Sequence, residues 1–259
     1  MGTWEEWEGM GNLLQERSQH AAVTLDRQVF IIGGDGSASS SSTTEVLTAD
    51  SKTWQQGPQL PIEMRYGPCA VAISASSFLV FYEKEIREFD QSIAGLVDAR
   101  NVGRPLRNQG WREERRWPKL KTSRIWWPGC AKVGGNKVII GGGFDGKSAH
   151  HTTEILDLTT RTIVQGGNMA MSRRSFHIIT FNNDAGDLTT LALGGRDNDD
   201  NKLETVEEWK AKTETWSTLE DGLKGKRYAF GLVALQRPLK NQGESVLSST
   251  FQRLVCPPQ

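Results

Sequence analysis

The chain has 259 residues, of which 37% are hydrophobic, and its 31 basic and 31 acidic side chains leave a formal net charge of zero. With a mean hydropathy of −0.49, it has the composition of a globular protein with one large β domain or two ordinary domains. The neutral charge excludes a global attraction to nucleic acid or to an anionic membrane. No apolar run approaches the roughly 18 residues that a membrane span needs. We therefore expect neither a nucleic-acid nor a membrane partner.

The N-terminus and the cysteines indicate the cellular compartment in which the protein is expected. Residues 1–7 are acidic and lack the cationic and apolar regions of a secretory signal. The three cysteines, Cys69, Cys130 and Cys256, are too widely spaced to form a metal-binding pair. A cytoplasmic location fits these features best, and a secreted form stays open if the natural chain starts elsewhere.

The first strand-like runs form a group of four, at 21–25, 29–32, 45–47 and 53–55. They are short, rich in β-branched and aromatic residues, and bounded by Gly, Asp and Ser, which favours strands over helices. A serine-rich stretch at 37–44 predicts a loop between the second and third strands.

An apolar run that ends in glycines recurs along the chain, at 29–34, 138–143 and 191–195. The first step, from Gly33 to Gly141, is about twice the second, from Gly141 to Gly194, as if one copy had lost its glycines. Strand units that repeat with a period near fifty residues are typical of a propeller.

Two further markers keep the same register. In three copies a large residue ends the third strand and is followed seven positions later by an apolar or aromatic residue: Leu47 and Trp54, Leu156 and Ile163, and Trp209 and Trp216. An arginine opens every copy, at Arg17, Arg65, Arg124, Arg174 and Arg227. Agreement among independent markers favours a true internal repeat.

The second copy is degenerate. Its second strand, 78–82, carries no glycine pair, and residues 91–110 look like an insertion, after which Trp111 or Trp117 takes the fourth-strand position. We predict one repeat domain over 1–235 and an irregular tail at 236–259. The predicted units span about 17–64, 65–123, 124–173 and 174–226, with a partial fifth at 227–235 and an outer strand at 3–10.

These markers resemble the kelch-repeat family. Ile31-Ile32-Gly33-Gly34, Leu47, Trp54 and Arg17-x-x-His20 fill the first unit, and Leu193-Gly194-Gly195, Trp209, Trp216 and Arg174-x-x-His177 fill the fourth. In the third unit, Ile139-Ile140-Gly141-Gly142, Leu156 and Arg124 match, with Ile163 in place of the tryptophan. The resemblance implies an all-β propeller with four four-stranded antiparallel blades and part of a fifth, as a small or incomplete ring.

The sequence carries no recognisable catalytic or metal motif. His20 and His177 occupy equivalent strand starts and are interpreted as structural, and the adjacent pair His150-His151 would point to opposite faces of a strand. The acidic loop at 197–201 resembles half of a calcium loop, but Lys202 stands where glycine is required, which favours a solvated loop. We expect no catalytic residue, no metal and no cofactor.

Two sets of charged residues can be interpreted either structurally or functionally. Glu45, Glu154 and Glu207 recur at one repeat position, which favours hydrogen bonding to a neighbouring loop. The basic segment at 100–124, with Trp111 and Trp117 within it, is consistent with an acidic partner, although a solvated loop is the preferred interpretation.

The best binding candidates lie where the inner strands begin and where the glycine pairs end, because strand alternation places both at one rim. Arginine and aromatic residues are enriched in binding hot spots. The predicted partner-binding residues are Arg65, Tyr66, Trp126, Trp127, Phe144, Asp145, Arg173, Arg196, Arg227 and Tyr228. For Arg17, Arg124 and Arg174 a bracing role between blades is an equal alternative.

Resemblance to kelch proteins implies a non-catalytic module that binds a protein or peptide, as an adaptor, a scaffold, a substrate receptor or a cytoskeletal partner. The alternatives are a kelch-like enzyme of the mutarotase, oxidase or iron-dependent specifier type, and a fragment of a larger kelch protein. The oligomeric state is not predicted, because fold does not determine function or assembly.

Overall fold

The computed structural model describes residues 11–36, 39–48, 53–94, 110–112, 116–183 and 185–229. The predicted outer strand at 3–10, most of the insertion, the strand beyond Ala229 and the tail at 236–259 lie outside these residues. The chain divides into two compact units, Met1–Leu120 and Lys121–Gln259, and each is described by itself. A search of the described helices finds none that is long and apolar enough to cross a membrane.

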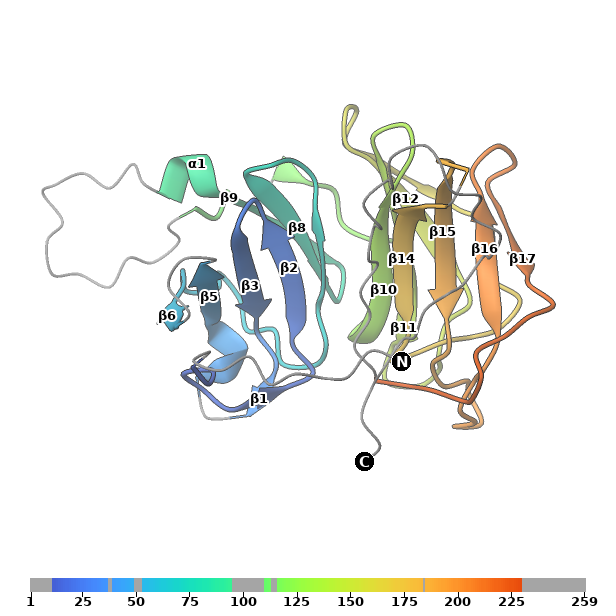
Figure 1. Cartoon of the computed structure of the whole chain (residues 1–259), viewed down its shortest axis with the longest axis horizontal. Coiled ribbons are helices and arrows are strands. Elements are labelled where there is room, and N and C mark those ends of the chain that lie inside the picture. Colours follow the sequence, from blue (N-terminus) through green and yellow to red (C-terminus); the bar gives the residue numbers. More distant parts are fainter. Residues whose placement is uncertain are drawn as a thin grey trace, which may run out of the picture. The chain divides into compact units, whose positions relative to one another are not determined.

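The first sheet of the N-terminal unit is antiparallel, with the strand order β2-β3-β5-β6 (Figure 1). Its strands are β2 (Ala21–Leu25), β3 (Gln28–Ile32), β5 (Thr44–Thr48) and β6 (Trp54–Gln56). Buried and exposed side chains alternate along β2, because successive residues of a strand point to opposite faces. The chain also forms a short pair, β1 (Arg17–Ser18) with β4 (Asp35–Gly36), and a 3₁₀ helix, η1 (Ser40–Ser42). The four predicted strands of the first copy are confirmed.

The second sheet has three strands, β7 (Cys69–Ala72), β8 (Ser77–Tyr82) and β9 (Glu85–Asp90), and one turn of helix, α1 (Gln91–Ala94), follows it. Trp111 forms an isolated antiparallel bridge with Phe89. The N–H of Arg112 donates to the carbonyl of Glu88 at 2.9 Å. Trp111, and not Trp117, therefore occupies the fourth-strand position of this degenerate copy.

Three side chains of the basic segment pair with the acidic residues of β9. Arg112 pairs with Asp90, Arg116 pairs with Glu88, and Lys119 Nζ lies 2.6 Å from Glu85 Oε1. Trp117 Nε1 donates to Glu88 Oε2 at 2.9 Å. Arg112, Arg116 and Lys119 thus neutralise the acidic side chains of β9.

The C-terminal unit contains two four-stranded antiparallel sheets (Figure 1). The first comprises β10 (Trp126–Val133), β11 (Lys137–Phe144), β12 (Thr153–Asp157) and β13 (Thr162–Gln165). The second comprises β14 (His177–Asn182), β15 (Leu188–Leu193), β16 (Val206–Lys210) and β17 (Thr215–Thr218). The all-β class and the antiparallel four-stranded unit are confirmed.

In each unit the core lies between the two sheets. In the N-terminal unit, Phe78 stacks on Phe89 with ring centroids 4.9 Å apart, and Trp111 meets both rings edge-on. In the C-terminal unit, Phe176 and Trp209 pack with buried aliphatic side chains of both sheets. Fully burying one such side chain contributes about 1.5–3 kcal/mol, which explains why large residues recur at these repeat positions.

The glycine pair of the third copy lies one residue later than the sequence register suggested. Gly142 and Gly143 have φ angles of +59° and +82°, as the pairs at 33–34 and 194–195 also have positive φ. Gly141 instead pairs with Thr153 inside the sheet. A Cβ on Gly142 would lie 2.5 Å from the carbonyl oxygen of Arg173, so this position needs glycine both for its backbone angle and for the close approach.

A recurring hydrogen bond links each glycine pair to the start of the following copy. The N–H groups of Gly34, Gly143 and Gly195 donate to the carbonyls of Met64, Arg173 and Arg227 at 2.7–2.8 Å. A residue with positive φ follows at each start: Gln19, Gly67, Trp127, Ser175 and Ala229. The bond to Arg227 and the positive φ of Ala229 repeat the geometry seen at the starts of the preceding copies.

Candidate functional site

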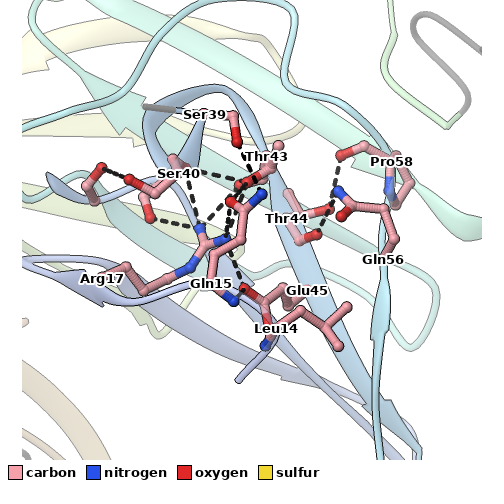
Figure 2. Close-up of polar contacts among 12 residues, drawn as sticks. Leu14, Gln15, Arg17, Ser39, Ser40, Thr43, Thr44, Glu45, Gln56 and Pro58 are labelled. Carbon is pink, nitrogen blue, oxygen red and sulfur yellow. Dashed lines mark hydrogen bonds and ion pairs between the residues drawn. The ribbon is translucent and has the colours of Figure 1, made fainter. Parts of the chain in front are cut away.

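A buried arginine braces three of the copies. From β1, the Arg17 guanidinium points into its own copy, where Nη2 lies 2.7 Å from Glu45 Oε1 and Nη1 donates to the carbonyl of Gly33 at 2.8 Å (Figure 2). Nη2 also donates to Thr43 Oγ1 at 2.9 Å. Both side chains of the ion pair are fully buried.

The same contacts recur in the third and fourth copies. Arg124 donates to Gly142, Thr152 and Glu154. Arg173 donates to the corresponding Gly194, Thr205 and Glu207. Burial lowers the pKa of Arg124 to about 10, and burial also lowers the pKa of Arg173. The partner carboxylates, Glu154 and Glu207, act in the opposite direction.

The three glutamates also bind the chain that precedes each arginine. In the first copy, the N–H groups of Leu14 and Gln15 donate to Glu45 at 2.6 and 3.1 Å. The same two positions before Arg124 and Arg173 donate to Glu154 and Glu207 in the same way. The predicted hydrogen-bonding role of these glutamates is confirmed.

Arg173 is therefore not available to a partner. Its side chain is fully buried, and its donors are taken by Gly194, Thr205 and Glu207. The placement of Arg173 among the partner-binding residues is wrong, because the bracing arginine of the fourth copy is Arg173 and the surface arginine is Arg174. The second copy lacks the bracing arginine: Met64, fully buried, occupies that position, and Arg65 follows it on the surface.

The exposed surface at this rim of the C-terminal unit is a stack of aromatic and guanidinium groups. We call it the arginine–aromatic stack, and it comprises Trp126, Trp127, Phe144, Arg174, Arg196, Asp200, Lys202 and Tyr228. Its residues come from the third copy, the fourth copy and the opening of the fifth. They meet because Trp126 pairs with Phe144 across β10 and β11, and Arg174 bridges Arg196.

The first half of the stack is aromatic. Trp126 lies flat on Phe144, with ring centroids 5.1 Å apart and an interplanar angle of 9°, and Trp127 is tilted against Trp126 at 5.7 Å. The Arg174 guanidinium carbon lies 5.0 Å from the centroid of Phe144. A guanidinium within about 6 Å of a ring face is attracted to it electrostatically.

The second half is ionic. Asp200 accepts from both Arg174 and Arg196, and the Arg196 guanidinium carbon lies 3.7 Å from the centroid of Tyr228. The hydrogen bond to Asp200 raises the pKa of Arg196, and the same bond lowers the pKa of Asp200. Tyr228 is 36% exposed, and Lys202 Nζ lies 5.2 Å from its ring centroid.

The loops that carry the stack are tied to each other. The Asn198 side chain accepts from the N–H of Ala149 at 2.6 Å and donates to the carbonyl of Ala149 at 3.2 Å. Asp145 accepts from the N–H groups of Lys147 and Ser148, both at 2.8 Å, which lowers its pKa. Such local bonds hold the surface in one shape before any ligand binds, which reduces the entropy lost on binding.

The structure brings together five of the ten predicted binding residues in the stack, Trp126, Trp127, Phe144, Arg196 and Tyr228, with Asp145 and Arg227 next to them in sequence. Arg65 belongs to the N-terminal unit, where it lies 3.6 Å from Asp35, and Tyr66 follows it there. Sequence reasoning missed Asp200, Lys202 and Asn198 as parts of this surface. They lie in a loop without periodicity, and only its acidic residues, Asp197, Asp199 and Asp200, drew attention to it.

The candidate metal positions do not converge. Asp197 Oδ1 accepts from the N–H groups of Asp199 and Asn201, so the acidic loop is closed by its own backbone. His150 Nε2 lies 3.5 Å from Asp145 Oδ2. Within the described ranges, no group of three or more His, Cys, Asp or Glu side chains is placed to hold a metal ion.

Comparison with known proteins agrees with this architecture. A family model described as the Kelch motif matches residues 16–61, which include the brace of Arg17 and Glu45 and the glycine pair at 33–34. An F-box/kelch-repeat protein of Arabidopsis thaliana is 33% identical over 52 residues, which are 20% of this chain and 20% of that protein. The predicted resemblance to the kelch-repeat family is confirmed. Kelch repeats generally mediate protein–protein interaction.

Proposed function

Since the chain carries kelch-type repeats, we propose that it is a non-catalytic module that binds a protein segment through the arginine–aromatic stack. In this proposal the module acts as an adaptor or scaffold in the cytoplasm. The observation that carries it is the continuous chain of contacts from Trp127 through Phe144, Arg174 and Asp200 to Tyr228, whose members are partly or fully exposed at the rim.

The chemistry of the stack supports a protein ligand. Aromatic and arginine side chains supply the largest contributions to protein interfaces, because they bury much area while keeping polar edges. Loops that are already tied by Asn198 lose little conformational freedom on binding. Acidic and basic side chains both occur here, so the surface favours a mixed polar and aromatic segment over a strongly charged one.

Site-specific photo-crosslinking tests the proposal. A photoreactive phenylalanine analogue replaces Tyr228 in the full chain, and the same analogue at Leu188, which is 52% exposed and outside the stack, is the matched control. We expect discrete protein adducts from position 228 that disappear when Arg196→Ala is added. The same adducts from both positions, or adducts that persist in Arg196→Ala, would contradict the proposal.

An enzymatic role of the iron-dependent type is the competing function. It predicts stoichiometric iron in protein purified from its native source. His150 and Asp145 form the only close His–carboxylate pair among the described ion pairs, so His150→Gln or Asp145→Asn should lose the metal. Elemental analysis of the full chain and the two variants separates this function from the binding module.

A further inference from the structure

A small pocket lies at the opposite end of the strands that carry the stack. It has a volume of about 350 Å³ and lies between the β10–β11 turn and the β16–β17 turn. Val133, Ile155 and Trp209 provide apolar walls. An added Cβ at Gly135, in the first of these turns, would meet nothing within 4 Å, so the space beside the turn is open.

Three charged side chains line this pocket. Lys137 Nζ lies 2.9 Å from Glu214 Oε1, so these two neutralise each other across neighbouring sheets. Lys212 is the third, and among the described residues no acidic side chain forms an ion pair with it. The lining therefore combines apolar walls with one uncompensated positive charge.

Apolar walls with a few polar groups are typical of ligand pockets, and 350 Å³ is near the lower end of their volumes. The wall formed by Trp209 suits an aromatic ring or a short aliphatic chain. We propose that this pocket binds a small carboxylic acid with an apolar body, whose carboxylate pairs with Lys212. The apolar body then packs on Val133, Ile155 and Trp209.

The pocket is independent of the proposed protein-binding surface. Trp126 belongs to the stack and Val133 to the pocket, and they begin and end the same strand, β10. Seven residue steps along a strand separate them by about 23 Å. A ligand in the pocket does not touch the stack, and each proposal can fail without the other.

The test is a nuclear magnetic resonance titration of the full chain with phenylacetate, beside 2-phenylethylamine and 2-phenylethanol at the same concentrations. We expect phenylacetate to shift the amide signals of Gly134 and Gly135 and the indole N–H of Trp209. The amine and the alcohol should bind about threefold to fivefold more weakly, because an exposed ion pair contributes up to about 1 kcal/mol. Equal binding of the amine, or shifts confined to other residues, would overturn the proposal.

Two variants and a control sharpen the result. Lys212→Gln should weaken phenylacetate binding about threefold to fivefold, and Ala211→Phe, at an exposed turn position, should abolish it by filling the pocket. Lys224 is an exposed lysine outside the pocket, so Lys224→Gln should leave the affinity for phenylacetate unchanged. Unchanged affinity in Lys212→Gln would overturn the proposal even if Ala211→Phe fails to fold. Tenfold tighter binding of acetyl-glycyl-leucine than of phenylacetate would instead assign the pocket to a protein C-terminus.

Discussion

Arg173 and Glu207 form an ion pair in which both side chains are fully buried, with 2.7 Å between Nη2 and Oε1, whereas the next residue, Arg174, lies on the surface with 20% of its side chain exposed. Two neighbouring arginines thus have separate tasks. The first joins the glycine pair, the third strand and the preceding loop of its copy. The second contributes to the surface that we propose as the binding site.

Arg173→Met should destabilise the protein by about 3–5 kcal/mol, because it leaves the Glu207 carboxylate buried without its cation. Urea unfolding at neutral pH measures the change. Arg174→Met, at the adjacent exposed position, is the matched control and should cost less than about 1 kcal/mol. A similar loss in both variants would contradict the assignment of Arg173 as the brace.

Gly142→Ala should be strongly destabilising for two reasons. Its φ of +59° is unfavourable for alanine, and the new Cβ would lie 2.5 Å from the Arg173 carbonyl oxygen. Gly146 also has positive φ but nothing within 4 Å of an added Cβ, so Gly146→Ala isolates the backbone cost of about 1–2 kcal/mol. Thermal unfolding should show a clearly larger loss for Gly142→Ala, and equal losses would exclude the close approach as a cause.

The contact between Arg174 and Phe144 should be measurable as a coupling energy. A double-mutant cycle of Arg174→Ala and Phe144→Ala should give about 0.5–1 kcal/mol, as expected for a cation–π pair near the surface. The cycle of Arg174→Ala with Trp209→Phe, a residue outside the stack, serves as the control. A coupling energy near zero in the first cycle would show that the stack is not an energetic unit.

Stability should fall as pH decreases from about 7 toward 5. Burial, and then the nearby positive charge of Arg124, lower the pKa of His150 below its ordinary value of 6.5. The unfolded chain then binds a proton at a higher pH than the folded chain, so stability is lost as pH falls through the unfolded value. Burial also lowers the pKa of His20, which acts in the same direction.

Chemical denaturation midpoints between pH 5 and 8 measure this dependence. His150→Gln should flatten part of the decrease, and His151→Gln, at the neighbouring position, is the matched control. The change below pH 4 has another origin, since hydrogen bonds from Ser148 and Lys147 lower the pKa of Asp145 and its protonation removes them only there. An unaltered profile in His150→Gln would exclude that histidine as a source.

Several features of this protein follow from the sequence alone, because they depend on local and periodic properties. The strands of the first copy, the glycine pairs of the first and fourth copies and the recurrent glutamates were all readable as repeated residue types. The resemblance to kelch repeats also rests on these markers, and residues 16–61 match the Kelch motif.

Only the tertiary structure decided which of two adjacent residues has the bracing position and which arginine lies on the surface, and which glycines have positive φ. A shift of one residue along a strand or its flank turns the side chain to the other face, so the choices between Arg173 and Arg174 and between Gly141 and Gly142 depended on long-range contacts. The same holds for Asp200 and Asn198, which reach the surface stack from a loop without periodicity. Asn198 contacts Ala149, and Asp200 contacts Arg174 in addition to its near neighbour Arg196. The long-range contacts form only when the chain has folded.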